Sequence, residues 1–202
     1  MADGSGRLDR AFYAQPTVNV ARALLGCVLV TNKGEGETRG RIVETEAYLG
    51  PDDPASHAAT RRTGGATAMW GPAGIAYVYR SYGIHAMFNV VCEPTGAPGA
   101  VLIRALEPIG GLDSMRERRG QVLDRLLCAG PGRLCTALGI RLEDHGQDLT
   151  ASTSMWIEEG VQVAGVVASG RIGISRGMEA PWRFFEGGSR YVSAHRRAAP
   201  VE

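Results

Sequence analysis

The stretch from Gly40 to Leu49 constrains the fold most, because it alternates like a strand whose two faces differ in chemistry. One face carries small or apolar side chains, at Val43, Thr45, Ala47 and Leu49. The other face carries Ile42, Glu44, Glu46 and Tyr48. It therefore places two carboxylates and a phenol at steps of roughly 7 Å. The first face therefore requires a hydrophobic core to cover it.

Two interpretations of the second face are open at this point. The plainer one is a half-exposed strand with two solvated glutamates, and periodicity alone favours it. The other is a functional site, because a carboxylate near a core is tolerated only when it is paired, hydrogen-bonded or used in acid-base chemistry. The residues around the strand must decide between the two.

Length and composition are typical of one globular domain. The chain has 202 residues, of which 44% are hydrophobic and 21% charged, enough for one sizeable core. We predict a disordered tail over residues 1–10 and a single domain over residues 11–198. The sequence has no apolar run long enough to span a bilayer, and its N-terminus lacks the apolar core of a signal peptide. It therefore favours an intracellular, cytoplasmic protein.

The four cysteines, at positions 27, 92, 128 and 135, are too scattered for a disulfide framework. They also lack Cys-x-x-Cys spacing, so we expect no zinc or iron-sulfur site. The dinucleotide fingerprint G-x-G-x-x-G is absent, and the sequence therefore gives no support for a nucleotide cofactor.

Local patterns predict an α+β fold: a single mixed domain with a curved, mostly antiparallel sheet, short flanking helices and a protruding β-hairpin. We expect helices over Pro16–Leu25, Pro108–Arg119 and Gly130–Gly139. We expect further strands over Cys27–Asn32, Ile75–Ser81, Ile84–Cys92, Gly99–Leu106, Met155–Glu159, Val161–Ala168, Arg171–Ser175 and Trp182–Glu186.

The predicted hairpin carries an aromatic residue, Tyr82, at its tip. Such a tyrosine either folds back on its own strands or is presented to a partner. The long stretch from Gly50 to Gly74 contains His57, Arg61 and Arg62 and is of a length typical of functional or disordered loops. His57 taken alone is more typical of a surface histidine.

The charge balance does not by itself indicate a nucleic-acid partner. The net charge is only +1, although 21 of the 22 basic residues are arginine and Lys33 is the single lysine. A GC-rich genome explains this bias as readily as a phosphate-binding surface. Arg119 and its basic neighbours at a predicted helix end suit the helix dipole without any ligand.

Several motifs follow one another in a characteristic order. They are Gly40-Arg-Ile-Val-Glu-Thr-Glu-Ala-Tyr-Leu-Gly-Pro with His57 following, Tyr77-Val-Tyr-Arg-Ser-Tyr-Gly, Asn89, Arg104-Ala-Leu-Glu-Pro and Gly130-Pro-Gly-Arg-Leu-Cys. Together they closely resemble the 3-methyladenine DNA glycosylase family, also called alkyladenine DNA glycosylases. The resemblance extends from about Gln15 to Arg196 and depends on the order and spacing of the motifs.

This resemblance implies a monofunctional enzyme that uses no metal or coenzyme and acts as a monomer on duplex DNA in base excision repair. It would flip out an alkylated or deaminated purine, such as 3-methyladenine, 7-methylguanine, hypoxanthine or an etheno adduct, and hydrolyse its bond to deoxyribose. The family roles fall on Glu46 as general base, Arg104 near the phosphate and water, Tyr48, His57 and Tyr79 around the base, Asn89 against guanine, and Tyr82 as the intercalating wedge.

The implied roles fit the residue types. Aromatic faces bind flipped bases, and they attract the positive charge of an alkylated purine. A carboxylate can stabilise an oxocarbenium-like transition state and activate water. Glu44 is expected to be structural or to raise the pKa of Glu46 as a like charge, and the sequence assigns no general acid. Lyase chemistry needs an amine, and Lys33 lies in a glycine-rich turn.

Some positions depart from the family pattern. Gly65-Ala66 replaces an Arg-Asn pair, Arg133 replaces a lysine, two residues are added between Asn89 and Arg104, and the loop between Gly173 and Trp182 is short. Arg61, Arg62 and Arg119 are the candidates for DNA contacts. Two alternatives remain open: a catalytically weak nucleic-acid-binding protein on the same fold, and a hydrolase of small nucleosides or sugars.

Overall fold

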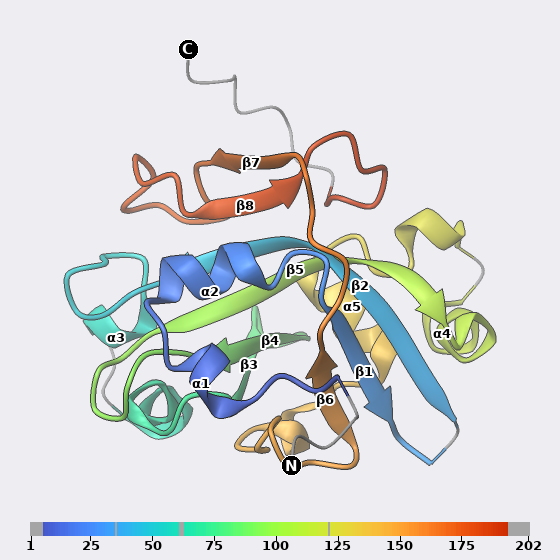
Figure 1. The fold of residues 1–202 in the computed structure, drawn as a ribbon, viewed down its shortest axis with the longest axis horizontal. Coiled ribbons are helices and arrows are strands. Elements are labelled where there is room, and N and C mark those ends of the chain that lie inside the picture. Colours follow the sequence, from blue (N-terminus) through green and yellow to red (C-terminus); the bar gives the residue numbers. More distant parts are fainter. Residues whose placement is uncertain (1–5, 35, 61–62, 121, 194–202) are drawn as a thin grey trace.

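A computed structural model describes residues 6–34, 36–60, 63–120 and 122–193. Its centre is an eight-stranded sheet with the order β3-β4-β5-β2-β1-β6, in which β8 also pairs with β2 and β7 pairs with β8 (Figure 1). The strands are β1 (Val28–Asn32), β2 (Glu37–Tyr48), β3 (Ala76–Ser81), β4 (His85–Val91), β5 (Ala100–Gly110), β6 (Met155–Glu158), β7 (Val166–Ser169) and β8 (Arg183–Glu186). All of these pairings are antiparallel, as predicted for an α+β domain.

Strand β2, which contains the predicted strand from Gly40, is the centre of the sheet. One edge pairs with β5 along almost its whole length. The other edge pairs with β1 over Glu37–Arg41 and with β8 over Glu44–Glu46. The second half of β2 is therefore enclosed by two strands, which removes its backbone and its side chains from solvent.

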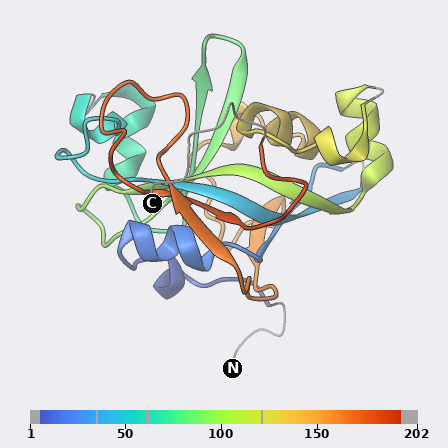
Figure 2. The same cartoon turned by 90° about the horizontal axis from the view of Figure 1, so that it is seen from above.

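Helices cover both sides of the sheet (Figure 2). On one side lie α1 (Arg10–Tyr13) and α2 (Thr17–Ala23), and Thr45 donates a 2.8 Å hydrogen bond to the carbonyl of Ala21. On the other side lie α4 (Leu112–Arg119), α5 (Pro131–Leu138) and the projecting β3–β4 hairpin. The short helices are α3 (His57–Thr60) and three 3-10 turns, η1 (Gly64–Trp70), η2 (Asp124–Leu126) and η3 (Leu142–Asp144).

Helix α5 shows how the sequence specifies these layers. Pro131 occupies its first turn and Gly139 ends it with a φ of 68°, the left-handed conformation that glycine adopts without steric cost. Leu134, Cys135, Ala137 and Leu138 are buried in the main core. The predicted helix is therefore present, and it packs an apolar face against β4 and β5.

The N-terminal residues join the sheet earlier than the predicted tail boundary at residue 10. The backbone of Leu8 donates to Ile157 at 2.9 Å, and Arg7 forms a bridge with Glu158. Asp9 caps α1 by accepting from the N–H of Phe12. Residues 7–10 are thus attached to the domain.

Three predicted elements are wrong in position or extent. The predicted helix from Pro108 begins at Leu112, because Pro108 and Gly110 continue β5 opposite Gly40 and Arg39. Proline signals a helix start in sequence, but here the pairing with β2 outweighs that preference. The predicted strand over residues 171–175 is a loop, and the predicted strand from Val161 is reduced to β7.

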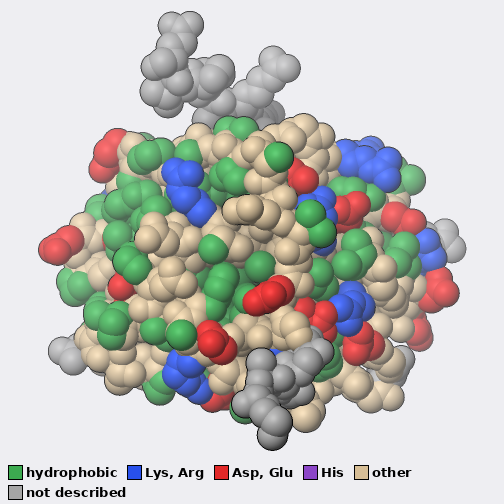
Figure 3. All heavy atoms as spheres, viewed as in Figure 1, with side chains coloured by type: hydrophobic (Ala, Val, Ile, Leu, Met, Phe, Trp, Pro, Cys, Tyr) green, Lys and Arg blue, Asp and Glu red, His purple; other side chains and the backbone are tan. Residues whose placement is uncertain are grey.

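No helix among the described residues is long and apolar enough to cross a membrane. The four cysteines are all buried and unbridged. On the face that carries α1, α2 and β6, acidic and basic side chains are interspersed, in keeping with the net charge of +1 (Figure 3).

Candidate active site

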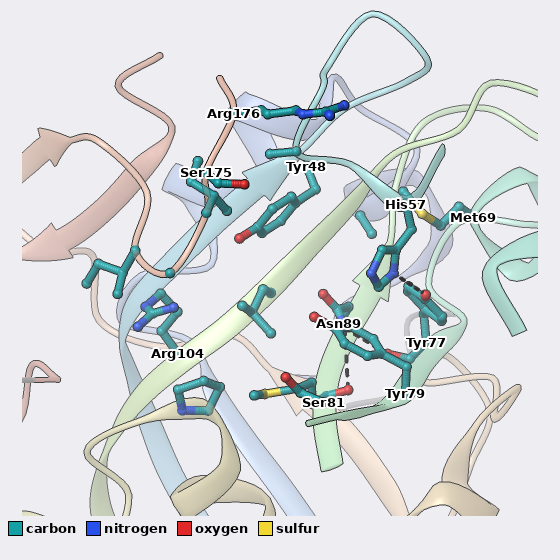
Figure 4. Close-up of a pocket in the computed structure, with 18 of the residues that line it drawn as sticks. Tyr48, His57, Met69, Tyr77, Tyr79, Ser81, Asn89, Arg104, Ser175 and Arg176 are labelled. Atoms are coloured by element: carbon teal, nitrogen blue, oxygen red, sulfur yellow. Dashed lines mark hydrogen bonds between the residues drawn. The ribbon is translucent and has the colours of Figure 1, made fainter. Parts of the chain in front are cut away.

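A pocket of about 440 Å³ opens between the end of β2, the β3–β4 hairpin and the loop over residues 172–176. Besides Tyr82, its lining includes five other residues singled out from the sequence, Tyr48, His57, Tyr79, Asn89 and Arg104 (Figure 4). They come from five different elements, β2, α3, β3, β4 and β5. This volume is within the range of small-molecule sites, roughly 300 to 1,000 Å³.

Glu46 lies beneath this pocket, and none of its surface is exposed. Its carboxylate accepts three hydrogen bonds, from the hydroxyl of Tyr48 at 2.8 Å, from Nη1 of Arg104 at 3.2 Å and from the N–H of Ile172 at 2.7 Å. All three donors belong to residues that line the pocket. Glu46 is therefore bonded directly to three residues of the pocket lining.

Glu44 is also fully buried, so the interpretation of β2 as a half-exposed strand with solvated glutamates is wrong. Its carboxylate accepts from Nε of Arg104 at 3.1 Å and from Nε of Arg183 at 2.7 Å. Ser193 adds bonds from its N–H at 2.7 Å and its hydroxyl at 2.9 Å. Glu44 thus joins the C-terminal segment to the sheet and orients Arg104, which reaches both glutamates.

The pairing of β2 with β5 is irregular at this point. Glu44 stands opposite Ala105 and Thr45 opposite Ile103, which leaves Val43 and Arg104 without an opposite residue. Irregularities of this kind often occur beside active sites, where they redirect a side chain. Arg104 is the residue affected here.

Burial raises the pKa of Glu46 above the usual glutamate range, since the charged form loses its hydration. Arg104, the N–H of Ile172 and the hydroxyl of Tyr48 act in the opposite direction but do not cancel the effect of burial. Burial also raises the pKa of Tyr79 to about 12, so its phenol is neutral at physiological pH. A carboxyl with a raised pKa in a pocket is a candidate acid-base group.

The wall opposite Tyr48 is aromatic. His57 Nδ1 lies 2.6 Å from the hydroxyl of Tyr77, and its ring packs edge-on against Tyr79 at 4.6 Å between centroids. His57 is therefore fixed in the pocket wall, and its interpretation as a surface histidine is wrong. Asn89 is only 3% exposed, and its Nδ2 donates to the carbonyl of Tyr77 at 3.0 Å.

Tyr82 projects from the hairpin tip and is 88% exposed. The alternative in which it folds back on its own strands is therefore wrong. Its φ of 49° is uncommon for a residue with a side chain. Ile84, two residues on, is 77% exposed, so the tip presents two large apolar side chains.

The other predicted contacts are less central. Arg61 and Arg62 lie outside the described residues. Arg119 lies on α4, where its Nε donates to the carbonyl of Leu127 at 3.0 Å, and it is not among the residues lining the pocket. Over the described residues, no group of three His, Cys, Asp or Glu side chains could hold a metal ion.

Two residues of the site were missed in the sequence. Tyr77 holds His57, and its alternation with Tyr79 on β3 was a usable signal. Arg171 is buried behind Tyr48, with Cζ 4.8 Å from the ring centroid. A buried arginine in a loop gives no periodic signal, and this segment resembles a strand in sequence.

Known proteins of similar sequence indicate the family of this chain. The family model described as Methylpurine-DNA glycosylase matches residues 11–190. A relative from Chlorobaculum parvum is 46% identical over 197 residues, covering 96% of this chain and 94% of its own length. One from Nitrosospira multiformis is 48% identical and covers 90% and 91%. Both carry the name "Putative 3-methyladenine DNA glycosylase". This chain belongs to the methylpurine-DNA glycosylase family.

Proposed function

We propose that this protein is a monofunctional DNA glycosylase that removes alkylated or deaminated purines from duplex DNA, with Glu46 activating the attacking water. The inferred substrates are 3-methyladenine, 7-methylguanine, hypoxanthine and etheno adducts. The relatives' names support the first of these, and the pocket size and aromatic walls are compatible with a single purine ring system. The observation that carries the proposal is the buried Glu46 carboxylate under an aromatic pocket.

The flipped purine enters between Tyr48 on one wall and His57 with Tyr79 on the other. Base stacking on aromatic side chains contributes roughly 1 to 3 kcal/mol per base, which offsets part of the cost of extrusion, roughly a few kcal/mol. Tyr82 fills the vacated position in the duplex from the minor groove. The side-chain amide of Asn89 donates to the backbone carbonyl of Tyr77. In that position Asn89 excludes guanine by rejecting its exocyclic amine.

The chemical step uses the free acceptor position of Glu46. A carboxylate offers about four acceptor positions, and three are occupied by Tyr48, Arg104 and Ile172. The remaining position binds a water molecule. The bond between the sugar carbon and the purine nitrogen breaks, the purine leaves with the electron pair of that bond, and the negative carboxylate stabilises the oxocarbenium-like transition state. The water oxygen forms the new bond to the sugar carbon as its proton passes to the carboxylate. Arg104 keeps Glu46 ionised and in place.

Strand cleavage does not follow base release. A lyase needs an amine that can form a Schiff base. Lys33, the single lysine, is paired with Asp144 and is not among the residues lining the pocket. The product is therefore an abasic but uncut strand.

The test is single-turnover base release from duplex DNA containing one 7-methylguanine or one hypoxanthine. Wild type releases the free base, and Glu46→Gln slows release by roughly 100- to 10,000-fold, the usual effect of losing a general base, with duplex binding retained. Glu117→Gln, the same substitution on the exposed face of α4, leaves release unchanged.

Two outcomes would favour the alternatives. A wild type that binds lesion DNA and never releases base is a catalytically weak binding protein on this fold. A wild type that hydrolyses free nucleosides as fast as duplex DNA is a nucleoside hydrolase, for which the exposed Tyr82 has no use.

A further inference from the structure

A buried ion pair lies directly behind one wall of the pocket. Both side chains of Arg171 and Asp53 are 0% exposed, with Nη1–Oδ2 at 2.6 Å and Nη2–Oδ1 at 2.8 Å. Asp53 also accepts from the N–H groups of Leu49 and Ala55. The pKa of Asp53 is lowered because the bonds from Arg171 and the backbone outweigh the opposing effect of burial. The carboxylate is therefore ionised.

The guanidinium of this pair covers one face of the Tyr48 ring. Cζ of Arg171 lies 4.8 Å from the centroid of Tyr48 and 5.0 Å from that of Trp182. Tyr48 lines the pocket whereas Arg171 does not. We therefore take the pocket to meet the face of Tyr48 opposite Arg171.

We propose that Asp53 sets the preference of the pocket between cationic and neutral bases, by neutralising the guanidinium behind Tyr48. This inference rests on the proposed function, since it concerns the base that stacks on Tyr48. It assigns a specificity-determining role to two residues that do not line the pocket. The pair keeps the wall attractive to a cationic purine.

The physical reason is the distance between the charges. A base stacked on the pocket face of Tyr48 lies about 8 Å from Arg171, taking a stacking distance of roughly 3.5 Å beyond the ring. At an effective dielectric constant of about 20, two positive charges at that separation repel enough to change affinity roughly 30-fold. A neutral base such as hypoxanthine is not subject to this repulsion. Arginine cannot relieve it by losing its proton.

The experiment is a charge series behind the ring, read as the ratio of 7-methylguanine to hypoxanthine release from otherwise identical duplexes. Asp53→Asn leaves the guanidinium unpaired, and the ratio falls roughly 10- to 30-fold. The double variant Asp53→Asn with Arg171→Gln is neutral, and its ratio stays within about threefold of wild type. Arg171→Gln alone leaves the carboxylate, and the ratio rises. The ratio cancels any loss of activity common to both lesions.

A matched control is Asp124→Asn, which removes a carboxylate from the exposed pair with Arg116 and leaves the ratio at the wild-type value. If Asp53→Asn does not fold, the opposite shift in Arg171→Gln still tests the inference. The inference is overturned if, in the variants that fold, the ratio does not fall with net positive charge behind Tyr48 and rise with net negative charge there.

The ratio of the dissociation constants for the two lesion duplexes is measured as well. For this measurement every protein of the series also carries Glu46→Gln, so that the base is not released during binding. Failure of wild type to release either base refutes the proposed function, whereas the binding ratios still test the role of Asp53. Normal release by wild type with a constant ratio across the series refutes the role of Asp53 alone.

Discussion

Glu46 combines complete burial with three hydrogen-bond donors, and the two effects on its pKa oppose each other. Burial favours the neutral acid, whereas the donors favour the carboxylate. The net result is a raised pKa, so the acid form persists to higher pH than in an exposed glutamate. Each donor therefore shifts the pH at which Glu46 becomes ionised.

This balance predicts how base release depends on pH. In the proposed mechanism release requires ionised Glu46, so the rate is expected to rise with pH, with the midpoint of that rise above about 4.3, the usual glutamate value. Tyr48→Phe keeps the stacking ring but removes a hydrogen bond that lowers the pKa of Glu46. The midpoint consequently moves to higher pH, as measured by single-turnover rates between pH 4 and 8.

The control for this prediction is Tyr191→Phe, whose hydroxyl accepts from neighbouring Arg190 on the surface. Its pH profile coincides with that of wild type. A midpoint that moves to lower pH in Tyr48→Phe would show that the hydroxyl does not stabilise the carboxylate.

At the scale of elements, the β3–β4 hairpin serves two purposes. Its base contributes Tyr77, Tyr79 and Asn89 to the pocket, where Tyr77 pairs directly with Asn89 across the two strands. Its tip projects Tyr82 into solvent. The paired strands of the hairpin therefore set the position of Tyr82 relative to the base of the pocket.

Tyr82→Ala is expected to lower base release from duplex DNA by roughly tenfold or more, because the gap left by the flipped base is no longer filled. Release from single-stranded DNA changes little, since no base pair has to be broken. The comparison of the two substrates is the measurement. The control is Val161→Ala, which also truncates an exposed apolar side chain and leaves both rates unchanged. If Tyr82→Ala lowers the release rate equally on both substrates, the wedge role is contradicted.

Helix α2 depends on a side chain from the distant loop between β4 and β5. Oε1 of Glu93 accepts from the N–H of Thr17 at 2.6 Å and from its hydroxyl at 2.8 Å. Glu93→Ala is expected to lower the free energy of unfolding by about 1 to 2 kcal/mol, the usual effect of losing a helix cap. Denaturant unfolding measures this loss, and Glu93→Gln, which keeps an acceptor oxygen, loses less.

At the scale of the whole molecule, segments far apart in sequence are joined by buried charges. Glu44 binds Ser193, and Asp53 binds Arg171, which also donates to the carbonyls of Ala47 and Gly177. These contacts attach the loop of residues 170–177 to the end of β2. The pocket wall therefore forms only when the chain has closed around the sheet.

The Arg171–Asp53 pair predicts how stability depends on pH. Asp53 has a lowered pKa in the folded state, so its contribution is complete above about 4, the usual aspartate value, and is lost as pH falls through the folded value. Asp53→Asn lowers the free energy of unfolding by about 3 to 5 kcal/mol at pH 7. The difference from wild type narrows below pH 4, as measured by denaturant unfolding at each pH. A difference independent of pH would contradict this linkage.

The sequence alone determined much of the framework. Alternation in β2 and the apolar spacing of α5 predicted these elements and their buried faces, because those signals depend on neighbouring residues in the chain. The motif order indicated the family and named Tyr48, His57, Tyr79, Asn89 and Arg104, which the fold brings into one pocket. Local helix preference gave a wrong prediction at Pro108, because this residue pairs with the distant Gly40 and so continues strand β5.

Only the tertiary structure decided the environment of those residues. Periodicity placed Glu44 and Glu46 on one face but could not show that β5 and β8 enclose it, or that Ile172 donates to Glu46 across 126 positions. It also gave no sign of Arg171 behind Tyr48. Burial and charge pairing arise from segments that meet only in the folded chain, and they determine the pKa of Glu46 and the charge behind Tyr48.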